Sequence, residues 1–125
     1  MNLVDSCGWL EYLTDGRHAE FYAPPLRDIR RLVVPPICIY EVFRKILTER
    51  GEDDALQAVA LMRQGIVSPL DGDLALEAAR LGLEHRLPMA DSIVLATAQQ
   101  HKAVLWTQDR HFAKVPGVKI PRGRG

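Results

Sequence analysis

The sequence lacks most of the motifs by which enzymes are identified. Its two cysteines, Cys7 and Cys38, are too few for a disulfide framework and lack metal-ligand spacing, so both are expected to be small buried hydrophobes. No glycine-rich phosphate loop, G-x-S-x-G turn or dinucleotide-binding fingerprint is present. The histidines, which show no zinc-site spacing, are His18, His85, His101 and His111. These absences argue against a zinc enzyme and against a nucleophilic enzyme.

An excess of one charge and a long apolar segment are also missing. Sixteen basic residues balance sixteen acidic ones, so the net charge does not predict nucleic-acid binding. A neutral total still permits a local acidic pocket rimmed by arginines. No segment approaches the roughly 20 apolar residues of a membrane span, and the start is too short and too acidic for a signal peptide. We therefore expect a cytoplasmic protein without membrane contact.

The composition is that of one soluble globular domain. The chain has 125 residues, of which 47% are hydrophobic and 26% charged. We expect the domain to span residues 1–121. The basic end PRGRG, and residues 122–125 in particular, is expected to be a disordered tail.

Short β-like runs alternate with helical patterns along the chain. Strands are expected at residues 3–5, 32–34, 66–67, 104–107 and, weakly, 118–120. Helices are expected at residues 8–14, 37–50, 53–63, 74–85 and 88–101, with a stretch at 19–31 that Pro24 and Pro25 divide. The alternation predicts an α/β sandwich around a mostly parallel sheet of four to five short strands. In such sheets ligands bind outside the carboxyl ends of the strands.

Four carboxylates stand where these elements begin or end: Asp5, Glu41, Asp91 and Asp109. Asp5 and Asp109 each follow the carboxyl end of an expected strand, which offers them a common site. Two carboxylates about 4 Å apart repel by roughly 4 kcal/mol at an effective dielectric near 20. A cluster of four must therefore bind protons, pair with basic side chains or hold a divalent cation. Without histidine or cysteine partners, such a cluster suits Mg²⁺ or Mn²⁺.

Each carboxylate also has a simpler structural interpretation. Asp5 and Asp109 can cap the helical turns that follow them. Glu41 falls opposite the apolar stripe of its helix and four residues before Lys45, so a solvated surface position explains it. That stripe comprises Ile39, Val42, Phe43, Ile46 and Leu47. Asp91 differs, because its helix is apolar on nearly every side, and a buried carboxylate is costly unless it is paired or bound to a metal.

Four segments, taken in order, resemble the PIN domain family. They are VDSCGWLEYL, PPICIYEVFRKIL, LPMADSIVLATAQQH and LWTQDRHF. More narrowly, they resemble the VapC toxin ribonucleases of type II toxin–antitoxin systems. The most specific part is an aspartate in an alanine-rich helix followed by T-x-D-x-x-F after a strand. The resemblance covers essentially the whole chain, and it implies a PIN-like α/β/α sandwich and a magnesium- or manganese-dependent endoribonuclease.

The resemblance also assigns roles to residues. It carries the acidic metal site onto Asp5, Glu41, Asp91 and Asp109, so no acidic position departs from the family pattern. The three aspartates would be ligands, directly or through water, while Glu41 would ligate a second ion or orient the attacking water. Thr107 would support the site through its hydroxyl, and Ser6 matches a small hydroxyl residue often found after the first aspartate.

Partners follow from the same resemblance: an RNA substrate, a cognate VapB-like antitoxin and a second copy of the chain in a homodimer. Arg44, Lys45 and Arg110 are candidate RNA contacts, although each is explained equally well as a surface charge. Trp9 and Tyr12 could line an apolar groove for the antitoxin. Burial in the core or in a homodimer contact explains these two aromatics equally well.

Other classes fit less well. A phosphoacceptor receiver domain needs a lysine near the last strand, and none ends the run at residues 104–107. A haloacid-dehalogenase-like phosphatase needs D-x-D after the first strand, where this chain has Asp5, Ser6 and Cys7. A housekeeping PIN-type RNA-processing nuclease and a non-catalytic α/β binding module stay open as alternatives.

Overall fold

A four-stranded parallel sheet lies at the centre of the structure, a computed structural model that describes residues 1–122. The strands are β1 (Asn2–Val4), β2 (Leu32–Val34), β3 (Ile66–Val67) and β4 (Val104–Trp106), in the order β3-β2-β1-β4. Leu3 of β1 pairs with Val33 of β2 and with Leu105 of β4, all in parallel register. The chain therefore adds strands on one side of β1 and then crosses to the other side for β4, which makes the β1–β4 boundary the switch point.

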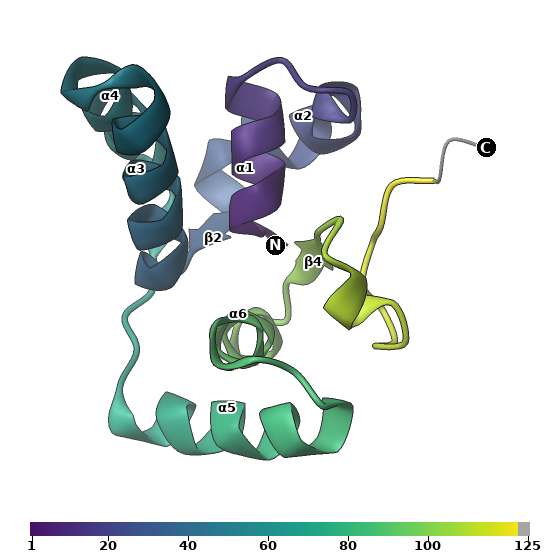
Figure 1. The fold of residues 1–125 in the computed structure, drawn as a ribbon. Helices are drawn as coiled ribbons and strands as arrows, with labels where there is room; N and C mark the ends of the chain where they lie inside the picture. Colours follow the sequence, from purple (N-terminus) through teal and green to yellow (C-terminus); the bar gives the residue numbers. More distant parts are fainter. Residues whose placement is uncertain (123–125) are drawn as a thin grey trace.

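Helices cover both faces of this sheet and confirm the expected α/β/α sandwich. The α-helices are α1 (Ser6–Leu13), α2 (Ala19–Arg27), α3 (Pro36–Arg50), α4 (Glu52–Met62), α5 (Gly72–His85) and α6 (Met89–Gln100). Two 3-10 turns, η1 (Ile29–Arg31) and η2 (Arg110–Phe112), complete the set. Figure 1 shows α1 and α2 above the strands, α6 below them with α5 as an outer layer, and α3 paired with α4 at one side.

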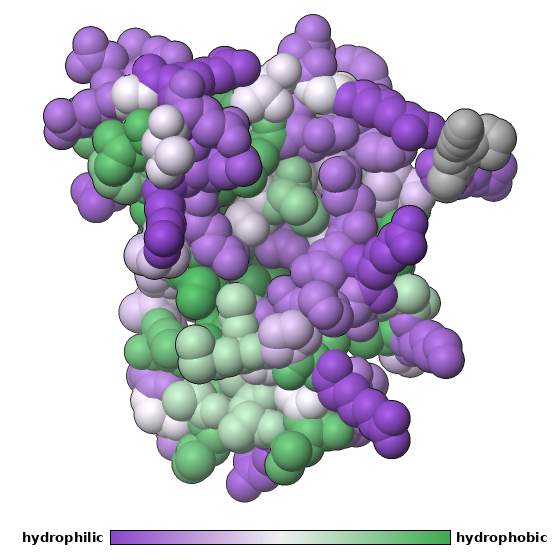
Figure 2. Space-filling model, in the orientation of Figure 1, coloured by the Kyte–Doolittle hydropathy of each residue, from purple (hydrophilic) through white to green (hydrophobic). Residues whose placement is uncertain are grey.

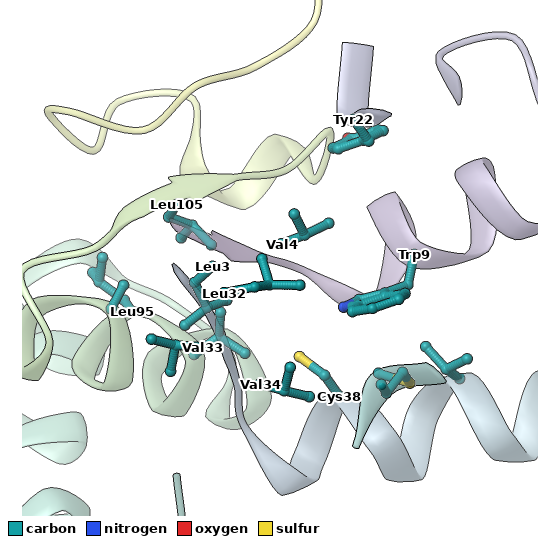
Figure 3. Close-up of a cluster of buried hydrophobic side chains, with 14 of the residues drawn as sticks. Leu3, Val4, Trp9, Tyr22, Leu32, Val33, Val34, Cys38, Leu95 and Leu105 are labelled. Carbon is teal, nitrogen blue, oxygen red and sulfur yellow. The ribbon is translucent and has the colours of Figure 1, made fainter. Parts of the chain in front are cut away.

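The strands are buried because helices cover both sides of them. Leu3, Val33 and Leu105 are 0–2% exposed, and Leu95 of α6 packs near them (Figure 3). Trp9 of α1 is fully buried on the other side of the sheet. These continuous apolar strands are typical of a parallel sheet with two covered faces. The burial of Trp9 assigns it to the core, so the groove interpretation is wrong for this residue.

Two expectations about secondary structure are wrong. Pro24 and Pro25 do not divide a helix, because α2 continues through both and ends at Arg27. Each proline removes one backbone N–H that would donate within this nine-residue helix, and the burial of Tyr22 and Leu26 keeps the helix in the core despite that loss. The strand expected at residues 118–120 is reduced to an isolated bridge between Trp106 and Lys119.

The remaining expectations concern the ends of the chain and the membrane. Of the expected tail at 122–125, residues 123–125 lie outside the described part. Within residues 1–122, no helix is both long enough and apolar enough to cross a bilayer.

Candidate metal centre

Asp5 stands directly after β1 and begins α1. Its Oδ1 accepts a hydrogen bond of 2.8 Å from the backbone N–H of Ser6, so Asp5 does cap the helix. Its Oδ2 accepts a hydrogen bond of 2.9 Å from the hydroxyl of Thr107, beyond the end of β4. The residue is only 4% exposed. Capping α1 and contributing to the site are therefore compatible roles for Asp5, because the cap fixes its carboxylate at the switch point.

Thr107 joins the ends of β1 and β4. Its side chain is fully buried, and its Oγ1 also accepts a hydrogen bond of 3.0 Å from the backbone N–H of Asp109. Asp109 in turn accepts at Oδ1 a hydrogen bond of 2.9 Å from the N–H of His111 and so caps η2. One threonine hydroxyl thus sets the position of two aspartates that are 104 residues apart in the sequence.

Glu41 lies at the edge between the buried and the solvated faces of α3, so the fully solvated position is only partly correct. The residues of α3 that are buried are Cys38, Val42 and Ile46, whereas Leu47 of the expected stripe is 42% exposed. The buried face is therefore rotated toward Glu41, which is half-buried and accepts a hydrogen bond of 2.9 Å at Oε1 from the hydroxyl of Ser6.

Lys45, the expected ion-pair partner of Glu41, pairs instead with Glu49, at 2.7 Å. This leaves Glu41 directed at α1 and the site.

Asp91 lies in the first turn of α6 and is 9% exposed, as its apolar surroundings predicted. Within residues 1–122, its Oδ2 is a buried oxygen that receives no hydrogen bond. The Nδ1 of His111 lies 3.0 Å from this oxygen, but the approach does not have hydrogen-bond geometry. A buried carboxylate oxygen without a partner is costly, so Asp91 requires a proton or a cation.

His111 is the residue that sequence reasoning missed. Its Nδ1 lies 2.7 Å from Oδ1 of Asp109 and 3.0 Å from Oδ2 of Asp91. The histidines were set aside because their spacing fits no zinc site. The position of His111 in the sequence could have identified it. His111 follows Asp109 by two residues, within the turn that Asp109 caps, and this turn keeps it close to the carboxylates.

The carboxylates influence one another electrostatically. Burial, followed by the nearby carboxylate of Asp109, raises the pKa of Asp91 to about 7; the charge of Asp5 adds to this shift, and the charge of His111 opposes it. Burial also raises the pKa of Asp5, against the hydrogen bonds from Thr107 and Ser6, with Glu41 and Asp109 contributing in the same direction as burial. The four carboxylates expected from the sequence therefore converge on one region in which added negative charge is disfavoured.

The donor atoms fit a hard divalent cation. Possible ligand atoms form two groups, each within 4.8 Å: Asp5, Cys38 and Glu41, and Asp91, Asp109 and His111. Burial raises the pKa of the Cys38 thiol well above its ordinary value, which disfavours the thiolate that a metal would bind. Burial likewise raises the pKa of the neighbouring Cys7 thiol to about 11. The remaining oxygen-rich set, together with the unpartnered Oδ2 of Asp91, suits Mg²⁺ or Mn²⁺.

Basic side chains lie near this acidic region. Arg44 and Lys45 are exposed and line, with Glu41, a shallow depression of about 350 Å³ on α3. Arg110 is exposed beside Asp109, at the start of η2. The three candidate RNA contacts are therefore all accessible, and two of them share a surface with one of the four acids.

The sequence and structure comparisons with known proteins agree on one family. The sequence profile of the PIN domain matches residues 3–118. A toxin–antitoxin complex from Klebsiella pneumoniae contains a chain with 26% identity and a TM-score of 0.80, with 98% of both chains covered. No curated protein sequence gives a significant match.

Two further solved structures share the fold. The toxin VapC20 from Mycobacterium tuberculosis, described as cleaving the sarcin–ricin loop, has 13% identity and a TM-score of 0.77, covering 96% of this chain and 98% of its own. A DNA-bound VapBC from Salmonella typhimurium has 17% identity and a TM-score of 0.72, covering 97% of this chain and 98% of its own.

Proposed function

The chain belongs to the PIN domain family, and we propose that it is a metal-dependent endoribonuclease acting as the toxin of a toxin–antitoxin pair. One observation carries this proposal: Asp5, Glu41, Asp91 and Asp109 converge at the carboxyl ends of β1 and β4, and Oδ2 of Asp91 has no partner within residues 1–122. The likeness to a chain of a toxin–antitoxin complex supports the toxin role. A non-catalytic binding module would have no use for such a costly group of carboxylates.

Magnesium or manganese would be held by Asp5, Asp91 and Asp109, with Glu41 on a second ion or on the attacking water. When bound, the ion supplies Lewis acidity toward a phosphodiester and toward water. Hydrolysis by water, rather than by the RNA 2′-hydroxyl, leaves a 3′-hydroxyl and a 5′-phosphate.

The hydroxyl residues position these carboxylates. Thr107 donates to Oδ2 of Asp5 and fixes the orientation of that carboxylate, while its other contact places Asp109. Ser6 donates to Oε1 of Glu41, which leaves Oε2 for a ligand or for a proton from water. A fixed set of carboxylates reduces the reorganisation needed when the charged substrate arrives.

RNA must approach this acidic region with its phosphates, so cationic residues at the rim are needed. Arg44, Lys45 and Arg110 would contact the backbone, which makes binding weaker at higher salt. The same acidity suits a basic side chain from a cognate VapB-like antitoxin, and insertion of that side chain would compete with metal and inhibit the toxin.

Cleavage assays test this function directly. Purified without antitoxin, the protein should cleave RNA with magnesium or manganese and stop when EDTA is added. Asp109→Asn should lower the rate at least about 100-fold, because a ligand is lost. Asp73→Asn is the matched control, since Asp73 is exposed in the first turn of α5, and it should cleave like the wild type.

Two outcomes would contradict the proposal. Undiminished cleavage in EDTA would exclude the metal mechanism. Full activity of the Asp109→Asn variant would show that the acidic region is not the active site.

A further inference from the structure

The second group of possible ligand atoms contains a nitrogen. Nδ1 of His111 lies within 4.8 Å of carboxylate oxygens of both Asp91 and Asp109. Magnesium is bound by oxygen ligands, whereas imidazole is a ligand for transition-metal ions. An imidazole at this place therefore changes which cation the site prefers.

The fold holds the His111 ring at the carboxylates. Asp109 caps η2 by accepting the N–H of His111, at 2.9 Å, and the next residue, Phe112, is fully buried and anchors the turn. The side chain of His111 itself is 56% exposed, so it does not serve as a core residue. Its polar neighbours in the described part of the chain are the two carboxylates, at 2.7 and 3.0 Å.

A second observation points to a ligand at the same place. Oδ2 of Asp91 is buried and receives no hydrogen bond within residues 1–122, even though Nδ1 of His111 is only 3.0 Å away. An imidazole that served only to neutralise Asp91 would donate to this oxygen. The pair instead presents a carboxylate oxygen and a ring nitrogen side by side, each able to bind a shared cation.

We propose that His111 is a ligand of the divalent cation, giving a mixed nitrogen and oxygen site that prefers manganese to magnesium more strongly than carboxylates alone would. The inference rests on the proposed function of the same site. Its physical basis is the greater affinity of transition-metal ions for imidazole.

Pulsed electron paramagnetic resonance of bound manganese tests the proposal without using activity. The full-length toxin, free of antitoxin, is loaded with less than one equivalent of Mn²⁺. Electron spin-echo modulation from a directly bound nitrogen should appear in the wild type and disappear in His111→Gln. His85→Gln is the matched control, because His85 lies beside a single carboxylate, Glu84, at 3.6 Å, at the end of α5, and the modulation should persist.

Calorimetry provides the second measurement. The ratio of the magnesium Kd to the manganese Kd should fall roughly tenfold or more in His111→Gln, as expected when a ligand side chain is removed, and stay unchanged in His85→Gln. Because His111 is largely exposed, the melting temperature of the metal-free His111→Gln variant should match that of the wild type, which shows that the variant is folded.

The outcomes separate this inference from the proposed function. The protein could bind manganese and cleave RNA while the wild type shows no nitrogen modulation, or while the modulation persists in His111→Gln. Either result would overturn the role of His111 and leave the nuclease proposal intact. Absence of both metal binding and RNA cleavage would overturn the proposed function itself.

Discussion

Hydroxyl groups, rather than lysine or arginine side chains, orient Asp5 and Glu41 of the candidate site. Thr107 donates to Asp5 and Ser6 donates to Glu41. In the part of the chain that the structure describes, no lysine or arginine lies within ion-pair distance of the four carboxylates. Hydroxyls orient a carboxylate without neutralising it, so the region keeps its affinity for a cation.

Asp91→Asn should change how the stability of the metal-free protein depends on pH. Folding raises the pKa of Asp91 from 3.8 to about 7, so the folded state holds this proton more tightly than the unfolded state does. The resulting stabilisation is present below pH 3.8 and is lost as the pH rises through about 7. Asparagine cannot ionise, so the melting temperature of the variant relative to the wild type should rise by several degrees between pH 5 and pH 8.

Thermal melts in EDTA at several pH values measure this difference. A variant that melts several degrees below the wild type at both ends of the range would make Asp91 a structural carboxylate with a protein partner.

The element that places Asp5 and Ser6 is α1, which begins at the end of β1 and packs closely against α2. Gly8 permits this contact: a Cβ built on it would lie 2.6 Å from Cγ1 of Val4 and 2.6 Å from Cε1 of Tyr22. Figure 3 shows Val4 and Tyr22 near this first turn of α1. The close approach keeps the carboxylate of Asp5 and the hydroxyl of Ser6 in place at the switch point.

Gly8→Ala should therefore destabilise the fold although alanine favours helices. The added methyl group forces α1 away from β1 and α2, an overpacking that costs about 1–3 kcal/mol. Denaturant melts of the metal-free protein measure this loss. Gly72→Ala is the matched control, because nothing lies within 4 Å of its added Cβ at the start of α5, and it should be neutral or slightly stabilising. Equal stability of Gly8→Ala and the wild type would show that α1 shifts freely.

At the scale of the whole molecule, the strand order brings the site together. The crossing from β3 back to β4 places Thr107 and Asp109 beside Asp5, at the one boundary where the direction of strand addition reverses.

The surface of the molecule carries polar and apolar residues in separate areas. Figure 2 shows hydrophobic residues gathered over the lower part of this face, where α5 and α6 lie, and Leu83 and Met89 are among the most exposed apolar side chains. Such an exposed apolar area is typical of a protein–protein contact, and the homodimer expected from the family resemblance is one way to cover it.

Expression in a bacterial host tests the toxin role. The wild-type chain alone should slow growth, because RNA cleavage is not inhibited, whereas the Asp109→Asn variant should not. Co-expression with the cognate antitoxin should restore growth through a stable complex. That complex should bind manganese more weakly than the free toxin, since the inserted basic side chain competes with the ion. Harmless expression of the folded wild type would favour a housekeeping RNA-processing nuclease.

The sequence by itself determined the elements and the chemical types of the site. Hydrophobic periodicity and turn residues placed the four strands of the sheet within a residue or two, and Asp71 caps α5 as expected. The apolar surroundings of Asp91 were enough to predict its burial, because a helix that is apolar on every side must lie inside the molecule. The cap positions of Asp5 and Asp109 were equally local and equally predictable.

Only the tertiary structure decided which faces meet. Periodicity shows which residues share a face of α3, but not which neighbour covers that face. A surface position was therefore an adequate explanation of Glu41 from the sequence, whereas in the structure it accepts a hydrogen bond from Ser6 of α1. Packing against the core likewise kept α2 continuous through Pro24 and Pro25. The contact of His111 with Asp91 crosses from η2 to α6, and only the strand order sets that distance. Local sequence encodes conformation and burial, whereas convergence depends on contacts between segments far apart in the chain.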